Sequence, residues 1–199
     1  MMRHGAGTTI VCALGALIAG CVSTPDARFF TLNATIDRAA ESSTLSVVVG
    51  PVSVPAAVDR PQIVVSTGPN QVRVDDFNRW ASPLQNNISR VVADNLVSIL
   101  GTPRVTVFPQ TLSANADYQA AVEVQSFGSA LGEAATLDAA WTVRRIKDGK
   151  LEVGRTTVRE PALEPGYDAL AAAHSRAVAR LSQDIADAVR ALDGLGQPR

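Results

Sequence analysis

Residues 117–160 alternate between apolar and polar side chains, and this period of two is typical of strands with one buried face. The apolar positions are Tyr118, Ala120, Val122 and Val124, then Ala135, Leu137, Ala139, Trp141 and Val143. Asp148-Gly149 favours a tight turn before a third strand, in which Gly154 predicts a bulge. The segment is therefore predicted to be an antiparallel meander with one covered face and one solvated face.

Two amphipathic helices could supply that cover. Apolar residues recur at three- and four-residue spacing over Ser82–Leu100 and again over Asp168–Leu192. For the first helix we expect Ser82 as the N-cap, Pro83 as the first helical residue and Gln85 in a capping box. The predicted class is α+β, an antiparallel or mixed sheet with both helices packed on one face.

The remaining strands are predicted in short, valine-rich or aromatic segments. Residues 62–66 and 71–75 surround a turn and predict a hairpin. Single strands are expected at 28–33, at 45–55 with a bend or bulge at Gly50-Pro51, and at 104–109, while 34–43 is expected to be a loop.

The first twenty residues have the features of an export signal. Arg3 gives a positive start, Ile10–Gly20 is uncharged and apolar, and the stretch is too short to span a bilayer stably. It ends in Ile18-Ala19-Gly20-Cys21, which resembles a bacterial lipobox. This predicts cleavage between Gly20 and Cys21 and a diacylglycerol on the Cys21 sulfur. The alternative is a plain secretory signal followed by an incidental cysteine.

Processing would divide the chain into four parts: the signal at 1–20, a lipidated tether at 21–27, a single α+β domain at 28–193 and a C-terminal tail at 194–199. Removal of 20 of the 199 residues leaves 179, with Cys21 as the one remaining cysteine and no intramolecular disulfide. An acidic residue directly after the lipidated cysteine tends to retain lipoproteins in the inner membrane. This chain has Val22 at that position, which predicts anchoring to the outer membrane on its periplasmic face.

The charge balance argues against a nucleic-acid partner. The chain has 18 basic and 19 acidic residues, whereas binding to a phosphate backbone needs a basic surface. Only 5% of the residues are aromatic, which also disfavours a platform for stacked bases.

Few residues suggest catalysis. His174 is the only histidine after the signal, and it lies on or beside the apolar stripe of the second helix, where a packed core histidine is expected. Asp75 and Asp76 are expected to be solvated acids at a strand end. No metal-ligand set, nucleophile motif or phosphate loop is apparent, so we expect no enzyme activity, no metal and no cofactor beyond the lipid on Cys21.

Two clusters are less ordinary: residues 60–64 (RPQIV) and 77–84 (FNRWASPL). We expect Trp80 to close the core over the start of the first helix, with Arg79 packed along it or bound to loop carbonyls. The alternative interpretation is that Arg60, Gln62 and Arg79 form a surface for a binding partner.

These clusters, with the lipobox, carry a family resemblance. The stretches FFTL at 29–32, VVVGPVSVPAAVDRPQIV at 47–64, FNRWASPLQNNISRVVADNL at 77–96 and AAHSRAVARLSQDIADAV at 172–189 resemble the PqiC-like ABC-type transport auxiliary lipoproteins. The resemblance covers nearly the whole chain after the signal. The chain departs from the pattern at Ala81, where an acid is more usual.

The resemblance implies a non-catalytic protein that serves beside an MCE-domain protein and an ABC permease and ATPase. Such systems move lipids between the two membranes, and the lipoprotein would be the docking component at the outer membrane. Alternatives are a lipid-binding carrier, a structural envelope lipoprotein and a periplasmic hydrolase that uses His174. Self-association into a homo-oligomer is left open.

Overall fold

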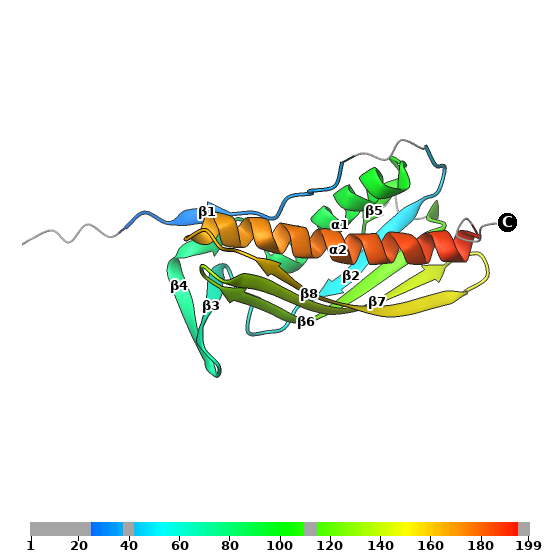
Figure 1. The fold of residues 1–199 in the computed structure, drawn as a ribbon. Helices are drawn as coiled ribbons and strands as arrows, with labels where there is room; N and C mark the ends of the chain where they lie inside the picture. The colour runs from blue at the N-terminus through cyan, green and yellow to red at the C-terminus, as the bar shows by residue number, and fades with distance from the viewer. Residues whose placement is uncertain (1–24, 38–41, 110–114, 195–199) are drawn as a thin grey trace, which may run out of the picture.

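The computed structural model describes residues 25–37, 42–109 and 115–194. Every predicted strand and helix is present in this part of the chain (Figure 1). The elements are β1 (Arg28–Phe30), β2 (Val47–Ser53), β3 (Gln62–Gly68), β4 (Gln71–Trp80), α1 (Leu84–Leu100), β5 (Val105–Val107), β6 (Tyr118–Ala130), β7 (Ala134–Arg145), β8 (Leu151–Pro161) and α2 (Tyr167–Asp193).

The larger sheet has five strands in the order β5-β2-β6-β7-β8. Strands β6, β7 and β8 form the antiparallel meander that the alternating pattern predicts. β2 runs parallel to both β5 and β6, so the sheet is mixed. Its pairing with β6 shifts between Val49 and Val52, which confirms the irregularity predicted at Gly50-Pro51.

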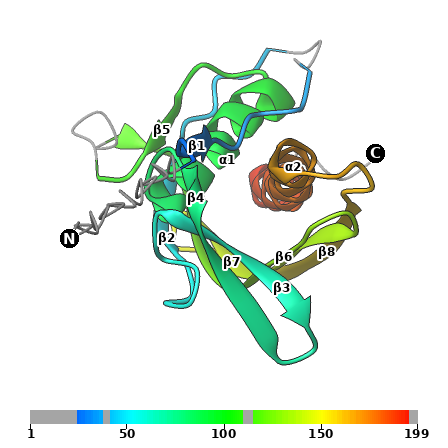
Figure 2. The ribbon, with the colours of Figure 1, turned by 90° about the vertical axis from the view of Figure 1, so that its left-hand side faces the viewer.

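Both helices cover the same face of this sheet, which confirms the predicted α+β class. Figure 2 shows α1 and α2 side by side above the strands, with α1 nearer β2 and β5 and α2 nearer β7 and β8. The buried face of each helix follows the predicted stripe, and the inward residues of the meander are buried beneath them. The core thus lies between the helices and the five-stranded sheet.

A second, three-stranded sheet has the order β1-β4-β3. β3 and β4 form the predicted hairpin, and β1 pairs in parallel with the far end of β4. The tip of the hairpin extends away from the body of the molecule (Figures 1 and 2). β4 is longer than predicted and contains an irregularity. Ile63 pairs with Asp75 and Gln62 pairs with Arg79, so the three residues between them on β4, Asp76, Phe77 and Asn78, have no partner on β3.

Two local predictions are wrong. Pro83, not Ser82, is the N-cap of α1, and it makes no side-chain cap hydrogen bond, so there is no capping box. The reason is backbone geometry: Pro83 is extended (φ −49°, ψ 131°), and its carbonyl accepts from Asn87 N at 3.0 Å.

The expected bulge at Gly154 is also absent. β7 and β8 pair in unbroken register, with Gly154 opposite Trp141. A Cβ at Gly154 would lie 2.2 Å from Cζ2 of Trp141. The glycine therefore leaves room for the indole, whose Nε1 donates to Thr156 Oγ1 at 3.0 Å.

Candidate functional site

The three-stranded sheet has one inward face and one exposed face. Alternation along its strands places Phe30, Ile63, Asp75 and Trp80 inward, where all four are buried. The opposite face, called here the hairpin face, consists of Phe29, Gln62, Val64, Val72, Val74, Phe77 and Arg79. Four of its five apolar members are exposed: Phe29 is 64% exposed, Val72 62%, and Val74 and Phe77 38% each, whereas Val64 is half-buried.

The hairpin face brings together two of the three residues that the sequence assigned to a partner surface. Gln62 and Arg79 are directly paired across β3 and β4, and Arg79 also pairs with Phe29 of β1. Arg79 Nε donates to the carbonyl of Asp76 at 2.8 Å, within β4 itself and not in a loop. Arg60 is exposed and precedes β3, so it borders the face without belonging to it.

Asp75 holds the base of the hairpin, and the expectation that it is a solvated turn acid is wrong. Its Oδ1 accepts from Phe77 N at 3.0 Å and from Asn78 N at 2.8 Å, which stabilises the excursion in β4. Its Oδ2 accepts from Tyr167 Oη at 2.6 Å in the interior. Burial tends to raise the pKa of Asp75, but these hydrogen bonds outweigh it and lower the pKa to about 2. Asp75 is therefore ionised at neutral pH, and its carboxylate joins the hairpin to the start of α2.

Trp80 closes the core as expected, at the point where β4 ends. Its ring lies edge-on to Phe127 and to His174, with centroids 6.1 Å away in each case. Phe127 and His174 are stacked at 3.9 Å. The three rings connect the smaller sheet, the larger sheet and α2.

His174 is a core residue, as the sequence predicts. It is fully buried, and its Nε2 lies 2.8 Å from Ser129 Oγ. Burial among aromatic rings lowers its pKa to about 3, so it is neutral at physiological pH. Its contacts are those of a packing residue, and no carboxylate hydrogen-bonds to its ring among the described residues.

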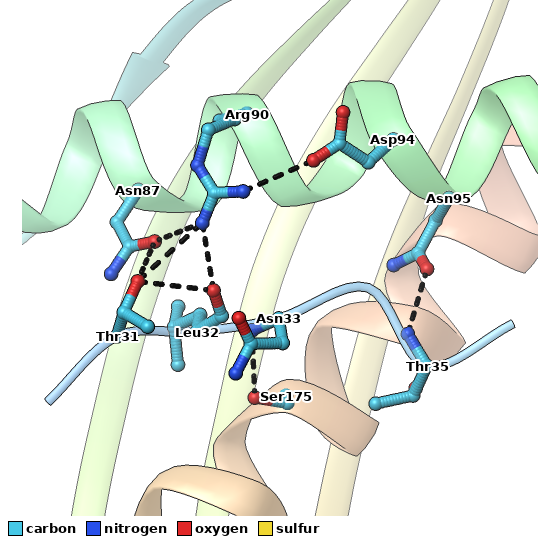
Figure 3. A network of polar contacts seen from close by, with 9 residues as sticks. All are labelled: Thr31, Leu32, Asn33, Thr35, Asn87, Arg90, Asp94, Asn95 and Ser175. Atoms are coloured by element: carbon cyan, nitrogen blue, oxygen red, sulfur yellow. Dashed lines mark hydrogen bonds and ion pairs between the residues drawn. The ribbon is translucent and has the colours of Figure 1, made fainter.

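The segment that follows β1 is held between the two helices by a polar network, shown in Figure 3. Arg90 of α1 donates to the Leu32 carbonyl at 2.8 Å and pairs with Asp94 at 3.1 Å. Asn33 N donates to Ser175 of α2 at 3.1 Å, and Thr35 N donates to Asn95 of α1 at 3.3 Å. The chain leaving β1 is thereby fastened to both helices.

Sequence reasoning missed this network. The available signal was the presence of Asn87, Asn95 and Ser175 among the apolar positions of the helices, where a buried polar side chain needs a partner. Arg90 Nη2 also donates to Asn87 Oδ1 at 3.1 Å.

Some sequence predictions fall outside the described residues. Gly20 and Cys21 are among these, so cleavage and lipidation stay predictions. Within the described ranges, no cluster of three or more His, Cys, Asp or Glu could hold a metal ion. No helix in the same ranges is both long and apolar enough to cross a membrane.

The fold defines a class of α+β proteins in which a long C-terminal helix and a shorter one cover one face of a mixed sheet. Two solved structures share this architecture. One is an uncharacterized protein with a TM-score of 0.68 and 22% identity, covering 83% of this chain and 99% of that one. The other, a Xanthomonas campestris protein of the family DUF330, has a TM-score of 0.70 and 18% identity, covering 86% and 100%.

The family follows from a match over most of the chain. Residues 30–186 match the family described as ABC-type transport auxiliary lipoprotein component. The chain belongs to this family, which confirms the resemblance drawn from the sequence. A comparison with curated proteins gives no match.

Proposed function

We propose that this protein is a lipid-anchored periplasmic component of an ABC-type system that moves lipids between membranes, and that it docks an MCE-domain protein at the outer membrane. The observation that carries the proposal is the family match over residues 30–186, which begins nine residues after the lipobox cysteine, Cys21. A transport auxiliary component that carries its own lipid anchor suits a docking role.

The anchor follows from the sequence. Acylation of Cys21 supplies about 0.8 kcal/mol per buried methylene, and several acyl chains make membrane attachment stable. Val22 at the next position favours the outer membrane. The domain then lies in the periplasm, close to the membrane that anchors it.

A non-enzymatic role is supported by what the buried polar groups do. Asp75 and His174, the buried groups of the described residues whose pKa values are lowered, are each held by contacts that connect secondary-structure elements. We infer that these groups are structural and that the protein acts through binding.

The docking role is tested by capture from native membranes. The full chain, tagged after Arg199 and produced in its own host, should co-purify from solubilised membranes with an MCE-domain protein. The Cys21→Ser chain, left as a precursor, should lose most of that capture and its outer-membrane fractionation. A genome without an MCE gene, or capture of an unrelated envelope protein in its place, overturns the docking role.

A further inference from the structure

We propose that the hairpin face rests on the lipid bilayer and that, together with the lipid on Cys21, it orients the domain at the membrane. The inference rests on the proposed acylation of Cys21 and goes further, because it assigns a membrane partner to the surface that contains Gln62 and Arg79. Its basis is the position of exposed apolar side chains relative to the anchored end of the chain.

The chemistry of the hairpin face fits the interfacial region of a bilayer. Phe29 and Val72 expose more than half of their surface, and Val74 and Phe77 add to the same face. Aromatic and aliphatic side chains on one exposed face partition into the boundary between headgroups and acyl chains, at a depth of about 5–10 Å. Arg79 and Gln62, in the middle of the face, can reach headgroup oxygens.

The length of the tether places this face within reach of the membrane. Cys21 and Arg28 are seven residues apart, and a fully extended chain spans at most about 25 Å over that number. β1 begins at Arg28 and carries Phe29, a member of the hairpin face. Arg28, beside the Phe29 edge of the hairpin face, therefore cannot be farther than this from the acylated cysteine.

Three other exposed apolar residues, Ile146, Leu151 and Val153, lie at the opposite end. Arg28 pairs with Asp168 at the start of α2, whereas the β7–β8 turn lies at its end, where Arg145 hydrogen-bonds to Leu192. The 27 residues of α2 separate the two ends by about 40 Å, beyond the reach of the tether (Figure 1). These three residues are therefore at the end of the fold farthest from the tether.

The charges around the hairpin face are balanced. Arg60 and Arg79 are accompanied by the exposed acids Asp59 and Asp76. The contact should therefore depend on apolar burial, with little dependence on anionic lipid or salt. This separates the proposal from electrostatic recruitment by a basic patch.

The test compares two valines of similar exposure at opposite ends of the fold. Val72 is 62% exposed on the hairpin face and Val153 is 71% exposed on β8. Val72→Cys and Val153→Cys are made in the full chain, isolated as mature acylated protein and labelled with the same fluorophore. The protein is reconstituted into phosphatidylethanolamine–phosphatidylcholine vesicles that contain a lipid with a nitroxide on its acyl chain.

The label at position 72 should be quenched at least about twofold more than the label at 153, because only the former lies at the depth of the headgroup boundary. Adding Phe29→Ser to the Val72→Cys chain should reduce the quenching, and salt should not. Equal quenching at 72 and 153 overturns the proposal.

The experiment also distinguishes a failure of the membrane contact from a failure of the lipid anchor on which the proposal depends. Mass spectrometry of the labelled chain reports acylation of Cys21 independently. An acylated, vesicle-bound chain without selective quenching overturns the membrane contact and leaves the anchor intact. A chain that is not acylated overturns both. A label at 72 that is shielded only by an added MCE protein or by a second copy assigns the hairpin face to a protein partner, which also overturns the proposal.

Discussion

The two sheets of this protein are built from similar alternating strands, but they differ in how they are covered. In the five-stranded sheet, two helices cover one face, and residues of the central strands such as Leu137 and Val143 have no exposed surface. In the three-stranded sheet, the inward side is packed from the base of the hairpin as far as Val65, and no helix covers the hairpin tip. An open groove of about 560 Å³, lined in part by Val65, Arg73 and Glu133, lies between the hairpin tip and the β6–β7 turn.

The difference shows that valine-rich alternation does not itself define a core. The same residue type is buried at Val143, on the face that the helices cover, and exposed at Val72, on a face that no helix covers. Substitutions matched across the two faces should therefore have very different effects on stability.

The largest effect is expected where the two sheets meet. Trp80→Ala removes a ring that is only 5% exposed, and it should lower the free energy of unfolding by about 3–5 kcal/mol. Phe77→Ala, on the exposed side of the same strand, should cost less than about 1 kcal/mol. Urea unfolding of the mature chain in detergent measures both. Equal losses would mean that the hairpin face is buried in the folded protein.

The joint between the hairpin and α2 should give the next largest effect. Tyr167→Phe removes the 2.6 Å hydrogen bond to Asp75, and loss of a hydrogen bond to a buried carboxylate should cost about 1.5–3 kcal/mol at neutral pH.

The pH dependence of this loss has a definite sign. The pKa of Asp75 is lowered from 3.8 to about 2 in the folded protein, so its stabilisation is present above pH 3.8. It is lost as the pH falls towards 2. The gap between the wild type and Tyr167→Phe should therefore narrow over that range. A gap that stays constant between pH 5 and pH 2 would show that Asp75 is not the acceptor.

Because of His174, the free energy of unfolding should decrease as the pH falls below about 6. Its folded pKa is about 3 and its ordinary value is 6.5, so the unfolded chain binds a proton that the folded chain does not. The free energy of unfolding should then decrease by about 1.4 kcal/mol per pH unit as the pH drops from about 6 to 5. Because no other histidine follows the signal, His174→Gln should abolish this slope. A slope that persists in the variant would assign it to other groups.

The parts of this fold that were predictable are those with local causes. The meander and both helices follow from the spacing of apolar residues, and the position of His174 in the core follows from the stripe on α2. The role of Asp75 was not predictable, because its partner Tyr167 lies 92 residues away. The same applies to β1: its pairing with β4 joins Phe30 to Trp80, and no local pattern assigns a three-residue strand to a sheet.

The smallest effect is expected on the hairpin face itself. Val72→Thr changes a methyl group to a hydroxyl where the side chain already meets solvent, and it should alter the free energy of unfolding by no more than about 0.5 kcal/mol. Val143→Thr, the matched change on β7, puts the hydroxyl where no surface is exposed and should cost about 1–3 kcal/mol. Both are measured by urea unfolding of the mature chain in detergent. A large loss for Val72→Thr would show that the hairpin face is covered within the protein itself. A neutral result, beside a clear loss for Val143→Thr, shows that Val72 contributes little to the stability of the domain whereas Val143 is part of its core.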